Sequence, residues 1–167
     1  MTAAGALVVL PIGPVPIVLQ NLFAVLSGLI LGPLLGSAAV GLFLLSGIIG
    51  LPVFAGGAGG IARFAGPTGG FLIGYLLAAL TSGLIAGRGS TKIPLLRIIL
   101  AVIAGFLVIY IPGIVWLKIS RNLNWIKALM AGFIPFIAGD ILKGIAAVIA
   151  APRLRRIASD LIADRRQ

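Results

Sequence analysis

The chain has no cysteine, no histidine and no glutamate, and its only carboxylate side chains are Asp140, Asp160 and Asp164. It therefore cannot form a disulfide, a Cys/His zinc site, a Ser-His-Asp triad or a cysteine nucleophile. Two of the aspartates lie in the charged C-terminal tail, so no pair of buried carboxylates is available for acid–base catalysis. No G-x-x-x-x-G-K-[ST] motif occurs, which excludes a P-loop for ATP. These absences argue against an enzyme and predict neither a metal nor a cofactor.

Charged residues make up only 10% of the 167 residues, whereas hydrophobic residues make up 60%. The mean hydropathy is +1.24. A water-soluble core of this size cannot hide so much apolar surface. A transmembrane helix needs about 20 apolar residues, so with short loops the chain has room for roughly six spans. We therefore predict an all-α, multi-pass membrane protein with about six transmembrane helices.

Glycine and proline divide the apolar sequence into the predicted spans. The first, 1–10, reaches only about 15 Å as a helix, half the thickness of a bilayer. It is either the second half of a span or a shortened helix, and no basic n-region or cleavage site indicates a signal peptide. A Pro-rich loop at 11–16 follows. The other spans are predicted at 17–31, 34–49, 71–86, 93–117 and 125–151, separated by Gly32-Pro33 and by loops at 50–70, 88–92 and 118–124.

The basic residues predict the orientation of the chain in the membrane. Lys and Arg number 13 against 3 acidic residues, and they lie at span ends, in loops and in the tail, so no nucleic-acid partner is expected. Eight cations fall on the side of the tail, namely Arg88, Lys92, Arg97, Arg153, Arg155, Arg156, Arg165 and Arg166, against Arg63, Lys118, Arg121 and Lys127 on the other. This bias predicts a plasma-membrane protein whose C-terminus is cytoplasmic.

The predicted domain organisation is a transmembrane bundle over 1–152 and a basic cytoplasmic tail over 153–167. Apolar residues recur in the tail at helical spacing, at Leu154, Ile157, Ala158, Leu161 and Ile162. This pattern is typical of an amphipathic helix lying on a membrane surface. A frayed, solvated end is an equally good interpretation of the last few residues.

A lone acid and a lone amine in the last span are the sharpest functional signal. Asp140 and Lys143 are three residues apart, on one helix face, with apolar sequence on both sides. Each charge costs about 2.5–3.5 kcal/mol near a helix centre on insertion scales, so such residues usually face the bundle interior. Either the two only neutralise each other, or the carboxylate accepts N–H groups of a small polar ligand while the ammonium meets an anionic group.

The Gly-rich segment 50–70 is the second signal, and its glycines and prolines predict an irregular loop without helix. Irregular backbone at membrane depth persists only where it lines a cavity or packs on protein. Gln20 stands at the start of the span 17–31, just after the Pro-rich loop, and its amide would either bind a ligand or cap loop backbone. Tyr110, Trp116 and Trp125 are predicted to anchor the interfacial aromatic belt.

Several motifs occur together in a fixed order. They are PVPIVLQ at 14–20, LGP at 31–33, GLPVFAGG at 50–57, GPTGGF at 66–71 and F-x-x-x-D-x-x-K at 136–143. In these motifs the chain resembles the BioY family, the biotin-specific S components of energy-coupling factor (ECF) transporters. The resemblance implies a six-helix S-component fold, binding of biotin from outside, and two kinds of partner, a transmembrane coupling subunit and a pair of ATPase subunits.

The resemblance also implies a biotin site. Its candidate residues are Asp140, Lys143, Gln20, Phe54, Gly56, Gly57, Gly59 and Gly60. We assign Asp140 to the ureido end of biotin and Lys143 to the carboxylate. Two alternatives stay open: an S component for another small vitamin-like substrate, and a non-catalytic structural subunit in which the Asp140–Lys143 pair only fixes helix register.

Overall fold

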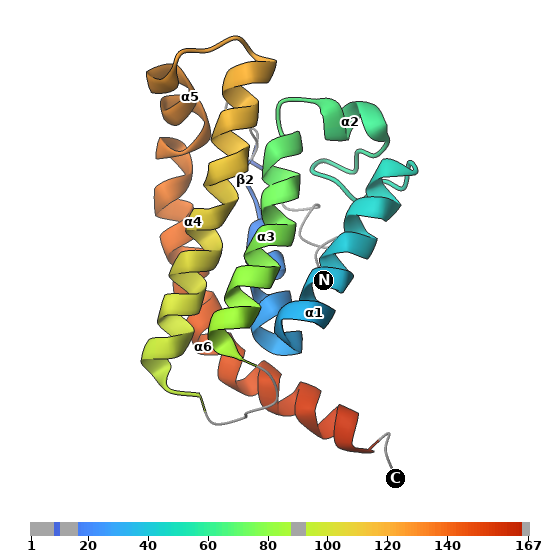
Figure 1. Cartoon of the computed structure of the whole chain (residues 1–167), viewed down its shortest axis with the longest axis vertical. Coiled ribbons are helices and arrows are strands. Elements are labelled where there is room, and N and C mark those ends of the chain that lie inside the picture. The colour runs from blue at the N-terminus through green and yellow to red at the C-terminus, as the bar shows by residue number, and fades with distance from the viewer. Residues whose placement is uncertain (1–8, 11–16, 88–92, 165–167) are drawn as a thin grey trace.

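The computed structural model describes residues 9–10, 17–87 and 93–164, which form a bundle of helices (Figure 1). Its elements are β1 (Val9–Leu10), β2 (Ile17–Val18), α1 (Gln20–Ile48), α2 (Ile61–Ala65), α3 (Gly69–Ala86), α4 (Leu95–Ser120), α5 (Trp125–Gly132), the 3-10 turn η2 (Ile134–Phe136) and α6 (Ile137–Asp164). Four helical segments of the described chain are long and apolar enough to cross a membrane, namely Gln20–Ile48, Gly69–Ala86, Leu95–Ser120 and Trp125–Asp160. The predicted all-α membrane bundle is confirmed.

Helix α1 consists of two helices joined at Gly32, and these correspond to the predicted spans 17–31 and 34–49. Gly32 has φ 81° and ψ 178°, a conformation that residues with a Cβ rarely adopt. Pro33 then supplies no N–H to the preceding turn. The two halves meet closely, because a Cβ on Gly36 would lie 2.7 Å from the Cα of Gly28. The predicted helix break is confirmed, and Figure 1 shows the chain reversing there.

The last predicted span, 125–151, is not one helix. Helix α5 ends at Gly132, η2 follows, and α6 starts at Ile137. The cause is Pro135, which lacks an N–H and whose ring clashes with the preceding turn of a continuous helix. Phe133 accordingly takes φ −129° and ψ −59°. The break lies just before Asp140 and turns Phe136 into the core, where it is buried.

Two further elements differ from the prediction. Segment 50–70 contains the short helix α2, because Ile61–Ala65 carries no glycine or proline between Gly60 and Gly66. In the N-terminal segment, Val9–Leu10 pairs antiparallel with Ile17–Val18 as a strand, while the remainder of the predicted span 1–10 lies outside the described residues. Helix α6 continues through Pro152, and its last turns run sideways beneath the bundle (Figure 1).

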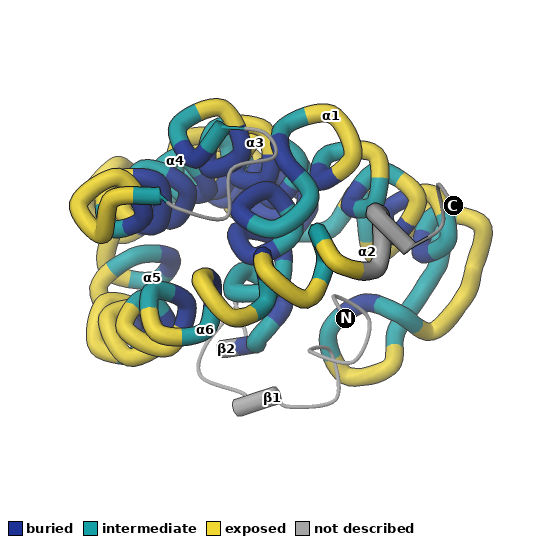
Figure 2. The backbone as a smooth tube through the Cα atoms, turned by 90° about the horizontal axis from the view of Figure 1, so that it is seen from below, coloured by how far each residue is buried: buried dark blue, intermediate teal, exposed yellow. Residues whose placement is uncertain are grey.

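The buried residues gather where α3 packs between α1 and α4, and the exposed residues cover the outside of the bundle (Figure 2). Ser82 of α3 is fully buried and donates a hydrogen bond to the carbonyl oxygen of Val25 at 3.1 Å. The exterior is itself apolar: Leu42, Leu84, Leu107, Leu142 and Ile149 are all more than half exposed. Such a surface is stable in lipid, where backbone groups are satisfied within helices. The protein is a multi-pass membrane protein.

Candidate functional site

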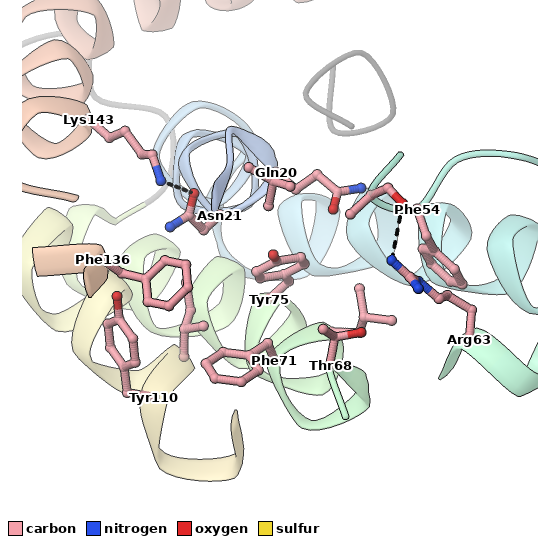
Figure 3. A pocket seen from close by; sticks show the side chains of 14 residues that line it. Gln20, Asn21, Phe54, Arg63, Thr68, Phe71, Tyr75, Tyr110, Phe136 and Lys143 are labelled. Carbon is pink, nitrogen blue, oxygen red and sulfur yellow. Dashed lines mark hydrogen bonds between the residues drawn. The ribbon is translucent and has the colours of Figure 1, made fainter. Parts of the chain in front are cut away.

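A hollow opens at one end of the bundle, between the start of α1, the loop that contains Phe54, helix α2, and helices α3, α4 and α6 (Figure 3). The space inside it for the centres of water-sized molecules is about 50 Å³, and part of the hollow is continuous with solvent. Its lining combines apolar walls with a few polar groups, as small-molecule sites usually do. The polar lining comes from Gln20, Asn21, Arg63, Thr68, Tyr75, Tyr110 and Lys143, and the apolar lining includes Val18, Phe54, Phe71, Leu72, Ile109 and Phe136.

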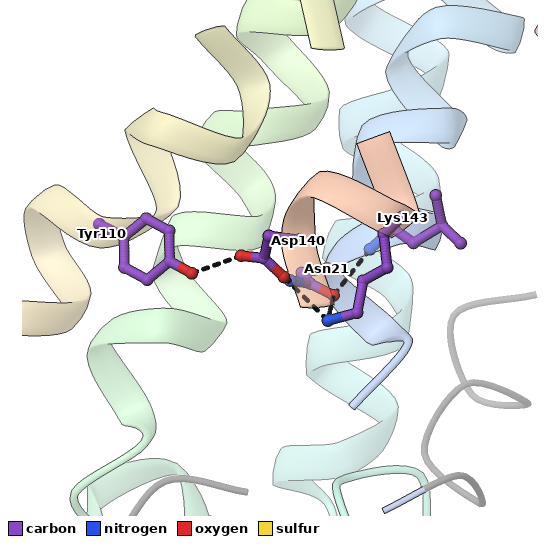
Figure 4. A network of polar contacts seen from close by, with 5 residues as sticks. Asn21, Tyr110, Asp140 and Lys143 are labelled. Carbon is purple, nitrogen blue, oxygen red and sulfur yellow. Dashed lines mark hydrogen bonds and ion pairs between the residues drawn. The ribbon is translucent and has the colours of Figure 1, made fainter. Parts of the chain in front are cut away.

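Asp140 and Lys143 form an ion pair inside the bundle, with 2.9 Å between Oδ1 and Nζ (Figure 4). They are 9% and 7% exposed, so their predicted place in the interior is confirmed. Asn21 of α1 bridges them: its Nδ2 donates to Asp140 Oδ1 at 2.9 Å, and its Oδ1 accepts from Lys143 Nζ at 3.2 Å. Tyr110 of α4 donates its hydroxyl to Asp140 Oδ2. Three helices thus converge on one carboxylate.

The two charged groups are not equivalent toward the hollow. Asp140 already accepts hydrogen bonds from Tyr110, Asn21 and Lys143. Lys143 uses two of its three donors on Asp140 and Asn21, so one donor stays available to a guest. Lys143 lines the hollow, whereas Asp140 lines an apolar groove between α4 and α6. The ammonium is therefore the group of the pair that faces the hollow.

Gln20 is the first residue of α1 and is 1% exposed. Its Nε2 donates to the carbonyl oxygen of Val53 at 2.9 Å, so the amide caps loop backbone, one of the two roles predicted for it. Figure 3 shows the carbonyl oxygen of the same amide turned toward the side of the hollow where Tyr75 lies. One amide thus fixes the loop with its nitrogen and presents an acceptor with its oxygen.

Phe54 anchors the loop over the hollow. Its ring is 1% exposed and packs edge-on against Phe43, with 5.7 Å between centroids. The ring lies directly on Gly47 of α1, where a Cβ would come within 2.1 Å of it. The backbone closes into a tight turn, since the N–H of Phe54 donates to the carbonyl of Ala58 at 2.8 Å. The turn leaves Phe54 and Ala55 on the wall of the hollow.

The four glycines of the candidate site shape this loop and do not line the hollow. Gly56 and Gly57 have φ values of 74° and 70° and form the turn after Phe54. Gly59 lies against backbone, because a Cβ there would come within 2.3 Å of the Leu51 carbonyl oxygen. Gly60, with φ 91°, donates its N–H to the Gly47 carbonyl at 2.7 Å. They hold Phe54 and Ala55 in place.

The sequence did not predict the roles of several residues in and around the hollow. Tyr110, which the sequence analysis assigned to the aromatic belt, donates its hydroxyl to Asp140. Trp116 binds the carbonyl oxygen of Gly66 at 2.9 Å and so ties α4 to the loop before α3. Asn21 carried a usable signal, because it is a second amide beside Gln20 at the start of an apolar span. Arg63 carried none, because only folding places α2 at the mouth of the hollow.

Residues 1–160 match the family model described as the BioY family. The chain is 43% identical over 155 residues to a probable biotin transporter BioY of Pyrococcus horikoshii, covering 93% of this chain and 90% of that protein. It is 37% identical over 157 residues to the biotin transporter BioY of Thermotoga maritima, covering 94% and 90%. The fold is also similar to the crystal structure of the S-component for biotin from an ECF-type ABC transporter, with a TM-score of 0.79 and 33% identity over 93% of this chain and 87% of the other.

Proposed function

This chain belongs to the BioY family, and on that premise we propose that it is a membrane-embedded, high-affinity biotin-binding subunit that mediates biotin uptake. The family comprises substrate-binding transporter subunits and not enzymes, and biotin is here the transported substrate rather than a cofactor. The observation that carries the proposal is the half-enclosed hollow with Lys143 at its inner end, held by Asp140 and Asn21. Biotin matches this lining, with a ureido ring, an apolar thioether ring and a carboxylate tail.

We place the ureido group at the inner end of the hollow. Asp140 and Lys143 already form a neutral pair there, so a second carboxylate would bring two like charges to one ammonium. The ureido carbonyl is neutral and can accept the free donor of Lys143, while a ureido N–H can donate to the Gln20 carbonyl oxygen. This reverses the assignment made from the sequence, in which Lys143 met the carboxylate.

The carboxylate of biotin then lies at the mouth, beside Arg63. Arg63 lines the hollow from α2 and is exposed. In the part of the chain that the structure describes, its one hydrogen bond goes to the Ala55 carbonyl at 3.4 Å and it has no carboxylate partner. A guanidinium can bind a carboxylate through two parallel hydrogen bonds. A carboxylate at the mouth also keeps part of its hydration.

Energy for uptake must come from elsewhere, because the sequence has no P-loop. We propose that a transmembrane ECF coupling subunit and two ATPase subunits supply it. The excess of Lys and Arg on the side of the tail supports a cytoplasmic C-terminus in the plasma membrane. The hollow, at the opposite end of the bundle, then faces outward.

The test is calorimetric titration of the purified protein with biotin. Asp140→Asn and Lys143→Ala should each weaken binding roughly 10- to 150-fold, because a hydrogen bond to a charged group contributes about 1.5–3 kcal/mol. Asp160→Asn and Lys127→Ala remove the same charges from exposed positions and should leave binding unchanged. Equal biotin affinity in the unmutated protein and all four variants would mean that the Asp140–Lys143 pair is only structural, and it would refute the proposed site.

A further inference from the structure

Arg155 is buried although it lies in the segment that the sequence marks as a surface helix. It is 5% exposed, whereas its neighbours Arg153 and Arg156 are exposed. Ile157 is 56% exposed, as an interfacial helix requires. The arginine therefore points into the bundle from the same turns of α6 that present an apolar side chain outward. The excess of Lys and Arg on the cytoplasmic side explains exposed cations at the end of α6, but it does not explain why Arg155 is buried.

The guanidinium of Arg155 joins three elements through backbone carbonyls. Its Nη1 donates to Leu29 of α1, and its Nη2 donates to Gly87, just after α3, at 3.0 Å. In an unbroken helix the Leu29 carbonyl would accept the N–H of residue 33, but that residue is Pro33 and has none. Arg155 thus replaces a hydrogen bond that the chain reversal removes. It also lies at two helix C-termini, where a cation is favoured.

Helix α6 and the first half of α1 are consequently fastened to each other at both ends. Near the hollow, Lys143 and Asp140 are hydrogen-bonded to Asn21. Twelve residues further along α6, about 18 Å along the helix axis, Arg155 is bonded to Leu29. Both partners, Asn21 and Leu29, belong to the helix that ends at the Gly32 break. A displacement of α6 at one bond must therefore strain the other.

We propose that Arg155 is a positioning residue for the biotin site, which makes α6 and the first half of α1 respond as one unit to occupation of the hollow. The inference rests on the proposed function and deepens it. When the free donor of Lys143 binds biotin, the hydrogen bond between Lys143 and Asn21 is strained. Because α6 and the first half of α1 are also bonded through Arg155, that strain changes the position of both helices at Arg155. Occupation of the hollow is thereby transmitted to the far end of the bundle, where the Gly32 break and the end of α3 lie.

The test uses the absence of cysteine from the chain, which allows two spin labels at defined sites. Leu35→Cys and Ile157→Cys place labels on residues that are 54% and 56% exposed, on the second half of α1 and on α6. In lipid nanodiscs, biotin should change the distance distribution between the labels by double electron–electron resonance. Arg155→Met should broaden the distribution, abolish its response to biotin and weaken biotin binding about 5-fold or more, the lower range of measured couplings.

Arg156→Met is the matched control, because it removes the same charge from the exposed neighbour, and it should behave like the unmutated protein. Arg155→Lys guards against misfolding of the Met variant: one ammonium keeps the charge but cannot bond both carbonyls in the geometry of a guanidinium. It should fold and lack the response. A response to biotin that persists in Arg155→Met or Arg155→Lys, or that is absent from the unmutated protein, overturns the proposal. A titration that detects no biotin binding to the unmutated protein refutes the proposed function instead. In that case the width of the distance distribution between the labels, measured without biotin in Arg155→Met, still tests whether Arg155 holds the two helices together.

Discussion

Asp140 and Lys143 persist inside an apolar bundle because each has partners on other helices. The carboxylate is bonded to Tyr110, Asn21 and Lys143, and the ammonium to Asp140 and Asn21. Removing one member of a buried pair leaves an uncompensated charge, which typically costs about 3–5 kcal/mol. This network therefore serves stability and leaves one ammonium donor for a ligand.

Tyr110 tests how far the network holds Lys143 in place. Tyr110→Phe removes the hydroxyl donor to Asp140 and keeps the ring, which packs edge-on against Phe71 and Phe133. We expect biotin affinity to fall roughly tenfold, which corresponds to about 1.4 kcal/mol for a hydrogen bond to a charged acceptor. Calorimetric titration measures the change, and a thermal melt checks folding. An unchanged affinity would mean that Tyr110 does not position the ion pair.

At the residue scale, the sequence allowed prediction of groups whose chemistry is conspicuous. A charge in an apolar span is unusual enough to identify Asp140 and Lys143, and an amide at the start of such a span identifies Gln20. Tyr110 and Arg63 could not be found in this way, because tyrosine is also common at membrane interfaces and arginine in loops. Their roles depend on which helices become neighbours, and that information is not local in sequence.

Among the elements, the loop before α2 depends on one close contact with α1. Gly47→Ala would insert a Cβ into the ring of Phe54, although alanine favours helix formation over glycine by about 1 kcal/mol. We expect the loop to be displaced and biotin binding to fall roughly 5- to 150-fold, since overpacking costs about 1–3 kcal/mol. Limited proteolysis in the loop should accelerate.

Gly41→Ala is the control for this change. Gly41 lies in the same half of α1, and a Cβ there would meet only Leu76 Cδ1 at 3.9 Å, an ordinary contact. Its biotin affinity should equal that of the unmutated protein. If Gly47→Ala also retains full affinity, Phe54 does not hold the loop over the hollow in the way described.

Element boundaries were predictable where glycine and proline both signal a break, as at Gly32-Pro33. Pro135 was missed because a proline can also be tolerated inside a long membrane helix, as Pro112 is in α4 and Pro152 in α6. Helix α2 was not predicted because it has only five residues and lies within a glycine-rich segment. A single proline in a long apolar span, and five residues between two glycines, are both ambiguous local signals.

The molecule as a whole places the hollow and the C-terminal part of α6 at opposite ends of the bundle (Figure 1). Single cysteines test the proposed orientation, since the chain has none of its own. Ile61→Cys on α2 is at a position 70% exposed, and Ile157→Cys on α6 at one 56% exposed. In intact cells a membrane-impermeant maleimide should label only Ile61→Cys, and Ile157→Cys should react after permeabilisation. The reverse pattern would invert the topology.

The central claim is that the Asp140–Lys143 pair receives the ureido end of biotin while Arg63 receives the carboxylate. Comparing the affinities of biotin and biotin methyl ester tests it most directly, because the ester lacks the negative charge. We predict that the unmutated protein prefers biotin, that Arg63→Met loses this preference, and that the neutral double variant Asp140→Asn, Lys143→Met weakens both ligands equally. Loss of the preference in the double variant, with the preference intact in Arg63→Met, would contradict the account.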